Sequence, residues 1–204
     1  MTVGRYHRAG RQRDCRQSRR AARGADRVTQ VERCADCGFV YDAIDARGAG
    51  TAIIEGATAL GRLVSDPRAD SRSRREPARW SPLEYACHVR DVLIVQRERV
   101  LLGRRRRAPT LEPMGRNERV EHDGYADQDP EDVARQLADA ARLFANVLSR
   151  LEDHDWERTV MYNYPARAER PLAWVAVHTL HEVQHHIRDV RHQLLPMAHT
   201  DRWA

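Results

Sequence analysis

Residues 81–102 restrict the fold of this chain more than any other stretch. Ser81, Pro82 and Glu84 mark a helix start: a serine N-cap, a proline at the first helical position and the glutamate of a capping box. We expect this helix to end at Gly103. Its apolar residues form a broad stripe that suits the interior of a helical bundle. They are Leu83, Ala86, Cys87, Val89, Leu93, Ile94, Val100 and Leu101.

Three other segments repeat apolar residues at the helical spacing of three and four. They predict helices over about residues 50–65, from Pro130 to about residue 151, and from just after Pro171 to about residue 195. Asp129 caps the second of these helices, and Pro196 stops the third. The expected core positions are Ile53, Ile54, Ala57, Leu60 and Val64; Val133, Leu137, Ala140, Ala141, Phe144, Val147, Leu148 and Leu151; and Leu172, Val175, Thr179, Val183, Ile187, Val190 and Leu194.

The segments between these helices have a different character. Residues 66–79 are rich in Pro, Ser and Arg and predict a loop, and residues 103–129 predict a long polar connection. Residues 156–165 are rich in aromatic and β-branched side chains and are expected to be extended. Because four long amphipathic helices occur without a convincing sheet, the sequence predicts an all-α four-helix bundle with long crossover connections.

The first 33 residues differ in composition from the rest. They hold ten Arg and three acidic residues, so their net positive charge is larger than the +5 of the whole chain. The rest of the chain is therefore mildly acidic. With few large apolar residues, this segment cannot bury enough surface to offset the entropy of ordering it. We therefore expect a disordered Arg-rich tail over 1–33, the bundle over 34–196 and a C-terminal tail over 197–204. A nucleic-acid-binding arm is the alternative for the first tail, and the bundle is not expected to bind nucleic acid.

Composition also bears on the location of the protein. No apolar run reaches the roughly 18 residues needed to cross a bilayer, and no signal-peptide pattern occurs. Four cysteines in 204 residues do not make a disulfide framework. The prediction is a cytoplasmic protein with no membrane partner. All basic residues are Arg and none is Lys, which suggests a GC-rich coding sequence of the actinobacterial type.

Five of the ten histidines lie between residues 178 and 192, on the last predicted helix. Residues four apart share a helix face, so His181 and His185 can direct two imidazoles at one ion. We place this pair beside the core face, and we place His186 on a different face where it is not expected to be a ligand. Imidazole ligands suit a divalent ion such as Zn, Ni or Fe, among which the sequence does not choose.

The same residues match the metalloprotease motif H-E-x-x-H, with Glu182 in the place of the base. The extended form of that motif requires a glycine and a third histidine further along the helix. This chain has Arg188 and Arg191 at those two positions. We therefore reject the protease interpretation.

A third histidine comes from the capped helix. The segment from Trp80 to Asp91, WSPLEYACHVRD, resembles the signature W-(S/T)-x-x-(E/Q)-x-x-x-H-(V/L)-x-(D/E) of the DinB superfamily. The later pair of His181 and His185 resembles the H-x-x-x-H pair on the final bundle helix of that family. The resemblance covers about residues 35–195. It implies a four-helix bundle in which His88, His181 and His185 hold a divalent metal.

The resemblance also implies an activity. Characterised relatives include transferases and isomerases that use a low-molecular-weight thiol such as mycothiol or bacillithiol. A metal-bound thiol is deprotonated, and the thiolate is the nucleophile. The expected partners are a small-molecule thiol and an electrophilic substrate. The sequence leaves the oligomeric state open, with a homodimer as one candidate. A metal-binding stress or regulatory protein without catalysis is the alternative.

Five further residues are candidates for supporting roles near the metal. Glu182 and Asp189 can accept a hydrogen bond from a ligand imidazole and so orient it. His178 shares the ligand stripe and is an alternative ligand. Arg188 can hold a carboxylate, and Tyr162 can line a pocket just before the ligand helix.

Two of the four cysteines form a short motif. Cys34 and Cys37, followed by glycine and phenylalanine, look like half of a zinc ribbon, but no second C-x-x-C occurs. We interpret them as a structural pair, with a metal site completed by His7 or by a second subunit as the alternative. Cys87 adjoins His88 but points elsewhere around the helix, so we expect it to pack as a small hydrophobe.

Overall fold

The computed structural model describes residues 32–164 and 166–194. The predicted C-terminal tail at 197–204, and the predicted N-terminal tail up to residue 31, lie outside the described residues. Glu32 and Arg33, assigned to that tail by the sequence, are described and contact the rest of the protein.

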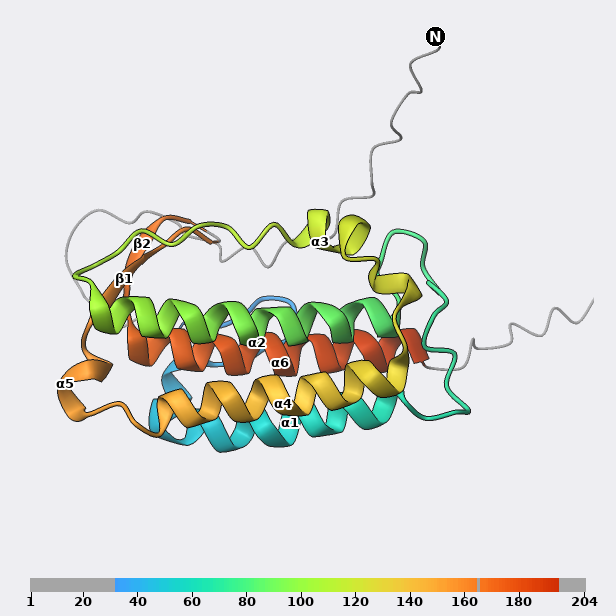
Figure 1. The fold of residues 1–204 in the computed structure, drawn as a ribbon, viewed down its shortest axis with the longest axis horizontal. Coiled ribbons are helices and arrows are strands. Elements are labelled where there is room, and N and C mark those ends of the chain that lie inside the picture. The colour runs from blue at the N-terminus through green and yellow to red at the C-terminus, as the bar shows by residue number, and fades with distance from the viewer. Residues whose placement is uncertain (1–31, 165, 195–204) are drawn as a thin grey trace, which may run out of the picture.

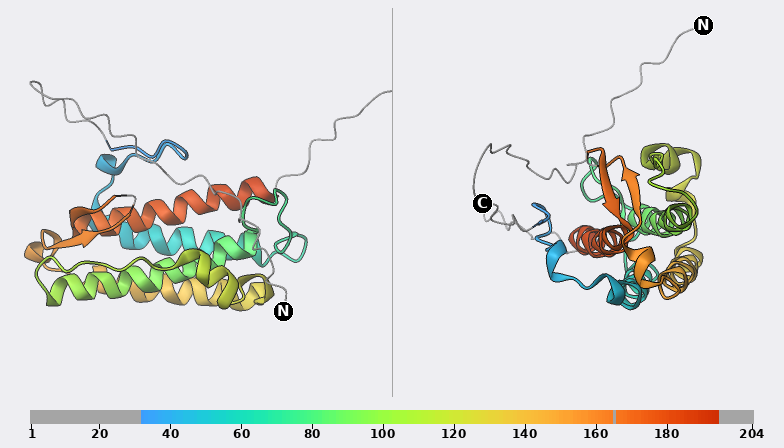
Figure 2. Two further views of the ribbon diagram at one scale, coloured as in Figure 1. Left: turned by 90° about the horizontal axis from the view of Figure 1, so that it is seen from above. Right: turned by 90° about the vertical axis from the view of Figure 1, so that its left-hand side faces the viewer.

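Four long helices form the body of the molecule, as the sequence predicts (Figure 1). They are α1 (Ala49–Val64), α2 (Pro82–Arg105), α4 (Pro130–Leu148) and α6 (Leu172–Leu194). Helices α1 and α2 lie diagonally opposite, and each packs on both α4 and α6. Seen end-on in Figure 2, the four helices enclose one core. Helices α1 and α6 run in one direction and α2 and α4 in the other (Figure 1).

This arrangement needs one long crossover, because α2 and α4 are parallel neighbours. Residues 106–129 run back along the bundle and carry α3 (Arg116–His122) and the 3₁₀ helix η3 (Tyr125–Asp127). The connection from α4 to α6 holds α5 (Asp153–Trp156) and an antiparallel hairpin of β1 (Thr159–Tyr162) and β2 (Ala168–Pro171). The crossover pairs with this hairpin, because the Leu111 amide donates to the Met161 carbonyl oxygen at 3.0 Å. The sequence predicted extended structure here but not the second strand.

The helix starts follow the predicted capping. Ser81 accepts from the Glu84 amide and Glu84 accepts from the Ser81 amide, which completes the capping box of α2. Asp129 caps α4 by accepting from two amides. The predicted end of α2 at Gly103 is wrong, since the helix continues to Arg105. Gly103 instead allows close packing, because a Cβ there would lie 2.8 Å from Leu172 Cδ2 and 2.9 Å from Val160 Cγ1.

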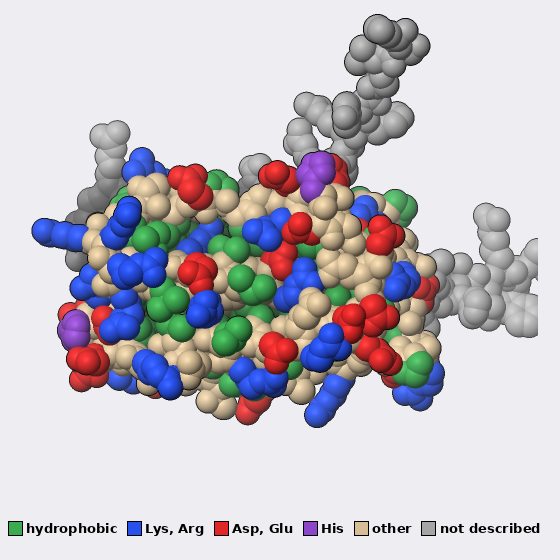
Figure 3. All heavy atoms as spheres, in the orientation of Figure 1, with side chains coloured by type: hydrophobic (Ala, Val, Ile, Leu, Met, Phe, Trp, Pro, Cys, Tyr) green, Lys and Arg blue, Asp and Glu red, His purple; other side chains and the backbone are tan. Residues whose placement is uncertain are grey.

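The core matches the predicted apolar faces closely. On α4 and α6 nearly all predicted positions are buried. Ile94 of α2 is an exception with 47% of its surface exposed. Helices α1 and α6 approach closely at Gly56, where a Cβ would lie only 2.6 Å from Val183 Cγ1. Arginine and acidic side chains are intermixed over the face shown in Figure 3.

Residues 32–48 form a segment that lies along the outer side of α6 (Figure 2). It includes the 3₁₀ helices η1 (Tyr41–Ala43) and η2 (Ala46–Gly48). Glu32 pairs with Arg170 at 3.4 Å and accepts from the Trp174 indole at 3.3 Å. Tyr41 stacks on the same indole, with ring centroids 5.9 Å apart. Among the described helices, none combines the length and apolar character that crossing a bilayer requires.

Candidate metal centre

Helix α6 presents its histidines on two different sides. At about 100° per residue, Glu182 and His186 lie about 100° and 60° from Val183, which is at the centre of the apolar stripe. These two side chains therefore border the bundle interior. His181 and His185 lie about 160° from Val183 on either side. The expectation that this pair lies beside the core face is wrong, since it occupies the outer face under residues 32–48.

His88 of α2 meets the inner side of α6. A donor atom of His88, of Glu182 and of His186 all lie within 4.8 Å of one another. The imidazole rings of His88 and His186 pack edge to face with centroids 5.0 Å apart. His186 lies on a different face from His181 and His185, as the sequence predicted, and the α2–α6 contact turns that face toward His88. Whether His186 is a ligand is not tested by this arrangement alone.

The signature residues of α2 hold His88 in place. The indole of Trp80 packs on the His88 ring with centroids 5.0 Å apart. The capping box fixes the helix start about two turns before His88, and Glu84 is further held by an ion pair with Arg74. Asp91, at the end of the signature, accepts from the Tyr125 hydroxyl at 2.6 Å and so ties α2 to the crossover. The main structural effect of the Trp80–Asp91 signature is therefore to position His88.

A carboxylate orients the second histidine of the cluster. Asp189 Oδ2 lies 2.9 Å from Nδ1 of His186, which places the imidazole proton on Nδ1. The other ring nitrogen, Nε2, lies 3.6 Å from Glu182 Oε2. Metal-binding histidines are commonly held in this way, with one nitrogen donating to a carboxylate and the other facing the ion. The orienting role of Asp189 toward a metal ligand, which the sequence suggested, stays a prediction.

The charges of the cluster are strongly perturbed. Burial lowers the pKa of His88 to about 3, so its imidazole is neutral at physiological pH. For His186, burial acts against the charge, but the hydrogen bonds to Asp189 and Glu182 outweigh it and raise the pKa to about 9. Burial likewise opposes the charge on Glu182, yet His181 and His186 hold the pKa of this carboxyl well below its usual range. A buried carboxylate beside neutral and protonated imidazoles is what a metal-free cation site would contain.

The cluster opens into a cavity of about 560 Å³. Trp80 and Tyr85 form an aromatic wall beside His88. Burial raises the pKa of Tyr85 to about 12, so its hydroxyl stays protonated. Arg79, Arg116 and Arg188 also line the cavity. The cavity therefore joins a group of possible metal ligands to a set of cationic and aromatic side chains.

The crossover supplies a residue that the sequence did not single out. Arg116, from α3, reaches the cavity and lies 5.8 Å from the ring centroid of Tyr164. Arg79 comes from the loop before α2 and pairs with Glu76 at 2.9 Å and with Asp189 at 3.7 Å. No local motif marks either arginine, because both reach the cavity through loop paths that helical periodicity does not describe.

The predicted ligands His181 and His185 lie together, but in a different group from His88. Their donor atoms and the thiols of Cys34 and Cys37 lie within 4.8 Å of one another. The predicted set of His88, His181 and His185 is thus divided between two neighbouring clusters. These clusters adjoin where His181 Nδ1 lies 3.6 Å from Glu182 Oε1 and where the rings of His185 and His186 pack together, and residues of both line the same cavity. As a ligand set for one ion, the predicted three histidines remain a prediction.

The other candidate residues have varied positions. His178 is buried, and its Nδ1 lies 2.9 Å from the Tyr41 hydroxyl. Arg188 lines the cavity and donates to the Asp36 carbonyl oxygen. Tyr162 does not line the cavity. Its hydroxyl accepts from Gln96 at 2.7 Å, and its ring packs edge-on against His178.

The residues around His88 fit a divalent ion. Nδ1 of His88 is buried and has no hydrogen-bond partner among the described residues. Buried polar atoms are rarely left in this state unless an ion or water satisfies them. Two imidazoles and one carboxylate form a donor set that transition metals use with open positions for other ligands. These two observations make His88, Glu182 and His186 a candidate set of metal ligands.

Comparison with protein-family models agrees with this architecture. The model of the DinB superfamily matches residues 56–190, which include α2, α6 and the whole His88 cluster. The chain belongs to the DinB superfamily. Cys34 and Cys37 precede the part of the chain that the DinB model matches.

A solved structure has the same fold. YfiT from Bacillus subtilis, described as "a probable metal-dependent hydrolase with an unusual four-helix bundle topology", superposes with a TM-score of 0.62 at 16% sequence identity. The match covers 72% of this chain and 85% of YfiT. It establishes the DinB-type four-helix fold that the sequence predicted. A search of curated proteins found no match.

Proposed function

We propose that this DinB-superfamily protein is a metal-dependent enzyme that transfers a low-molecular-weight thiol to an electrophilic substrate. The observation that supports it is the meeting of His88, Glu182 and His186 at a cavity of about 560 Å³. These residues would hold one divalent ion. A bound ion lowers the pKa of a coordinated thiol or water, so that a nucleophile forms at neutral pH.

The protein's own residues would position the reactants. Asp189 holds the Nδ1 proton of His186, which keeps Nε2 directed toward the cluster. Trp80 packs on His88 and limits the rotation of its ring. Arg116 and Arg188 place positive charge along the cavity, where they would bind a carboxylate of the thiol or of its electrophilic partner. Tyr85 stays protonated and can donate a hydrogen bond to a leaving group.

The test uses the full chain loaded with zinc. Mycothiol and monochlorobimane are mixed with the protein, and conjugate formation is compared with the rate without protein. We expect a metal-dependent rate that chelation removes and that His88→Ala abolishes. His154→Ala is the matched control, because that histidine is exposed on α5 and does not line the cavity. A rate that persists in His88→Ala would contradict the proposal.

Hydrolysis is the second candidate, and it is favoured by the similarity to YfiT. In that reaction water takes the place of the thiol as the nucleophile. A panel of amide and ester substrates, with and without added thiol, separates the two reactions. Turnover that needs no thiol would support hydrolysis. If metal binds but neither reaction occurs, the non-catalytic alternative gains support. The homodimer and the cytoplasmic location remain predictions.

A further inference from the structure

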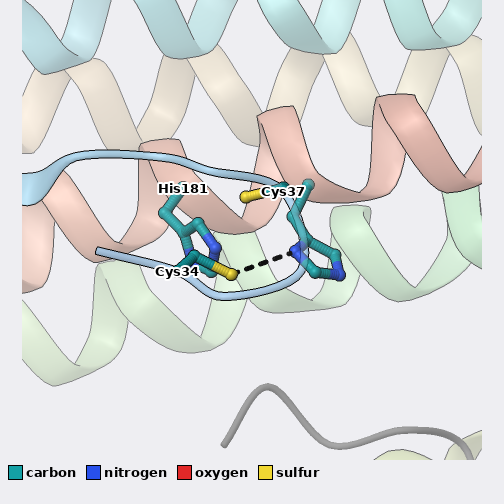
Figure 4. A group of neighbouring side chains, drawn as sticks. Cys34, Cys37 and His181 are labelled. Carbon is teal, nitrogen blue, oxygen red and sulfur yellow. Dashed lines mark hydrogen bonds between the residues drawn. The ribbon is translucent and has the colours of Figure 1, made fainter. Parts of the chain in front are cut away.

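We propose a second metal site in this protein, in which Cys34, Cys37, His181 and His185 bind one zinc-type ion and fasten residues 32–48 to α6. Figure 4 shows the two thiols reaching from the N-terminal loop toward the imidazole of His181. The inference does not depend on the proposed enzyme activity, because it concerns a different set of four ligands.

The distances fit tetrahedral coordination. The four donor atoms lie within 4.8 Å of one another, and Cys34 Sγ lies 3.8 Å from His185 Nδ1. With metal–sulfur and metal–nitrogen bonds of about 2.3 and 2.0 Å, a sulfur and a nitrogen bound to the same tetrahedral ion are about 3.5 Å apart. The side chains would therefore need only small shifts to close around an ion.

The loop between the cysteines has a backbone conformation that suits two thiol ligands of one ion. The Gly38 amide donates to the Cys34 carbonyl oxygen at 3.0 Å, and the Cys34 amide donates to the Phe39 carbonyl oxygen at 2.9 Å. Gly38 has φ of +78°, a conformation that glycine adopts without strain. This tight turn brings both thiols to the same side of the loop.

The two histidines are held by acceptors on their other nitrogens. Nδ1 of His181 hydrogen-bonds with the Tyr41 hydroxyl at 2.9 Å. Nε2 of His185 lies 3.5 Å from Asp189 Oδ2, while its Nδ1 faces Cys34. Each ring thus has one nitrogen engaged by an oxygen, which is the usual support of a metal-bound imidazole.

The donor chemistry distinguishes this site from the His88 cluster. Two thiolates and two imidazoles form a complete set of four protein ligands, as in structural zinc sites. Cys34 and His181 are buried, and Cys37 and His185 are half-buried. Such a closed site leaves no position for substrate. The His88 cluster offers only three protein donors, so an ion there would keep positions open toward the cavity that residues of both sites line.

The site gives residues 32–48 a defined role. This segment precedes the region matched by the DinB family model, yet it covers the outer face of α6. Asp36 and Cys37 also line the cavity that His88 opens into. The ion would therefore lock one wall of that cavity in place.

Cobalt substitution tests the site directly. The full-length wild-type protein is loaded with Co²⁺ and its absorption spectrum is recorded. We expect intense thiolate-to-cobalt charge-transfer absorption together with the visible bands of a tetrahedral ion. The double variant Cys34→Ser/Cys37→Ser should lose the charge-transfer absorption. Cys87→Ser, which removes a buried thiol elsewhere, should keep it. A wild-type spectrum without thiolate absorption, or one retained in the double variant, overturns the proposal.

The histidine ligands are tested in the same assay. His181→Ala/His185→Ala should lose the tetrahedral bands, and unchanged bands would overturn the assignment of these two ligands. His88→Ala should keep the thiolate absorption while losing one equivalent of metal. Failure of His88→Ala to lose metal would count against the proposed enzyme site and leave the cysteine site supported by its own spectrum.

A measurement on the wild-type protein tests the site even if the variants do not fold. Zinc-loaded wild-type protein is treated with iodoacetamide before and after chelation, and the modified peptides are identified by mass spectrometry. We expect Cys34 and Cys37 to be protected by zinc and to become reactive once it is removed. Equal alkylation of both thiols with and without zinc overturns the proposal.

Discussion

The carboxylate of Asp189 lies 2.9 Å from Nδ1 of His186, and the same oxygen lies 3.5 Å from Nε2 of His185. These two histidines belong to different clusters, one facing the bundle interior and one facing the N-terminal segment. One carboxylate therefore supports a ligand of each candidate metal site. We expect Asp189→Ala to lower metal affinity at the His88 cluster by about 10–100-fold, because the His186 ring loses its orienting acceptor. Competition with a chromophoric chelator measures this change.

The matched control for that variant is Asp139→Ala. Asp139 pairs with Arg142 on the exposed surface of α4 and touches neither cluster. Unchanged affinity in Asp189→Ala would show that the carboxylate does not orient the metal ligand.

Metal binding at the His88 cluster should depend on pH through His186. Its pKa of about 9 means that the metal-free ring is protonated at neutral pH, while that of His88, about 3, leaves that ring neutral. A metal ion must displace the His186 proton, so affinity should rise as pH increases from 7 toward about 9. Chelator competition across this range, in the Cys34→Ser/Cys37→Ser background, isolates the cluster. Affinity that does not change with pH would contradict the predicted proton release.

The same titration affects the metal-free fold in the opposite sense. The pKa of His186 is raised from 6.5 to about 9 on folding, so its proton stabilises the fold fully below pH 6.5. That contribution is lost as the pH rises through about 9. Urea unfolding of chelated protein at pH 6 and at pH 9.5 should show lower stability at the higher pH, and His186→Gln should reduce the difference.

Gly56→Ala should destabilise the bundle. The added Cβ would lie 2.6 Å from Val183 Cγ1, so α1 and α6 would have to separate. Overpacking of this kind costs about 1–3 kcal/mol, offset in part by the better helix propensity of alanine, about 1 kcal/mol. Urea unfolding gives the net change. Gly48→Ala is the control, since no atom lies within 4 Å of the Cβ it adds. If the double variant Gly56→Ala/Val183→Ala has the stability of the wild type, the contact between the two positions is confirmed. If the double variant and Gly56→Ala lose the same stability, the contact is excluded as the cause.

Asp91→Ala should lower stability more than any surface substitution. Its carboxylate accepts from Arg90 at 2.8 Å and from Tyr125 at 2.6 Å, and all three side chains are largely buried. Removing one member of a buried ion pair leaves the other charge uncompensated and costs about 3–5 kcal/mol. Thermal and urea unfolding measure the loss. Tyr125→Phe removes a single hydrogen bond and should cost less, and a larger loss in that variant would contradict this account.

The sequence was sufficient for most of the fold. The capping box at Ser81 and the cap at Asp129 are local interactions, so the chain within a few residues of each determines them. The apolar stripe of α4 was also predicted well, because burial of one face follows from helical periodicity alone. Gly103 was misinterpreted because glycine can either end a helix or admit a close neighbour, and only the hairpin contact decides between these.

The site was predicted less completely for a related reason. Periodicity shows which residues share a helix face, but it does not show which neighbour covers that face. His186 became a candidate ligand only because α2 packs against its side of α6. His181 and His185 turn toward Cys34 and Cys37, which lie about 150 residues away in the chain, as the 151-residue separation of Cys34 and His185 shows. Contacts of that range leave no spacing pattern in a single sequence.

Arg116 reaches the cavity on the crossover, whereas the candidate ligands at His88, Glu182 and His186 stand on the rigid helices. Of the two arginines that would bind the substrate, Arg116 is therefore on a separate element from the residues that would bind the ion, whereas Arg188 shares α6 with them. Substitutions at Arg116 could therefore alter substrate choice while the Tyr125 hydrogen bond to Asp91, which ties the crossover to α2, is kept. For an engineer, Arg116 is the natural position to diversify.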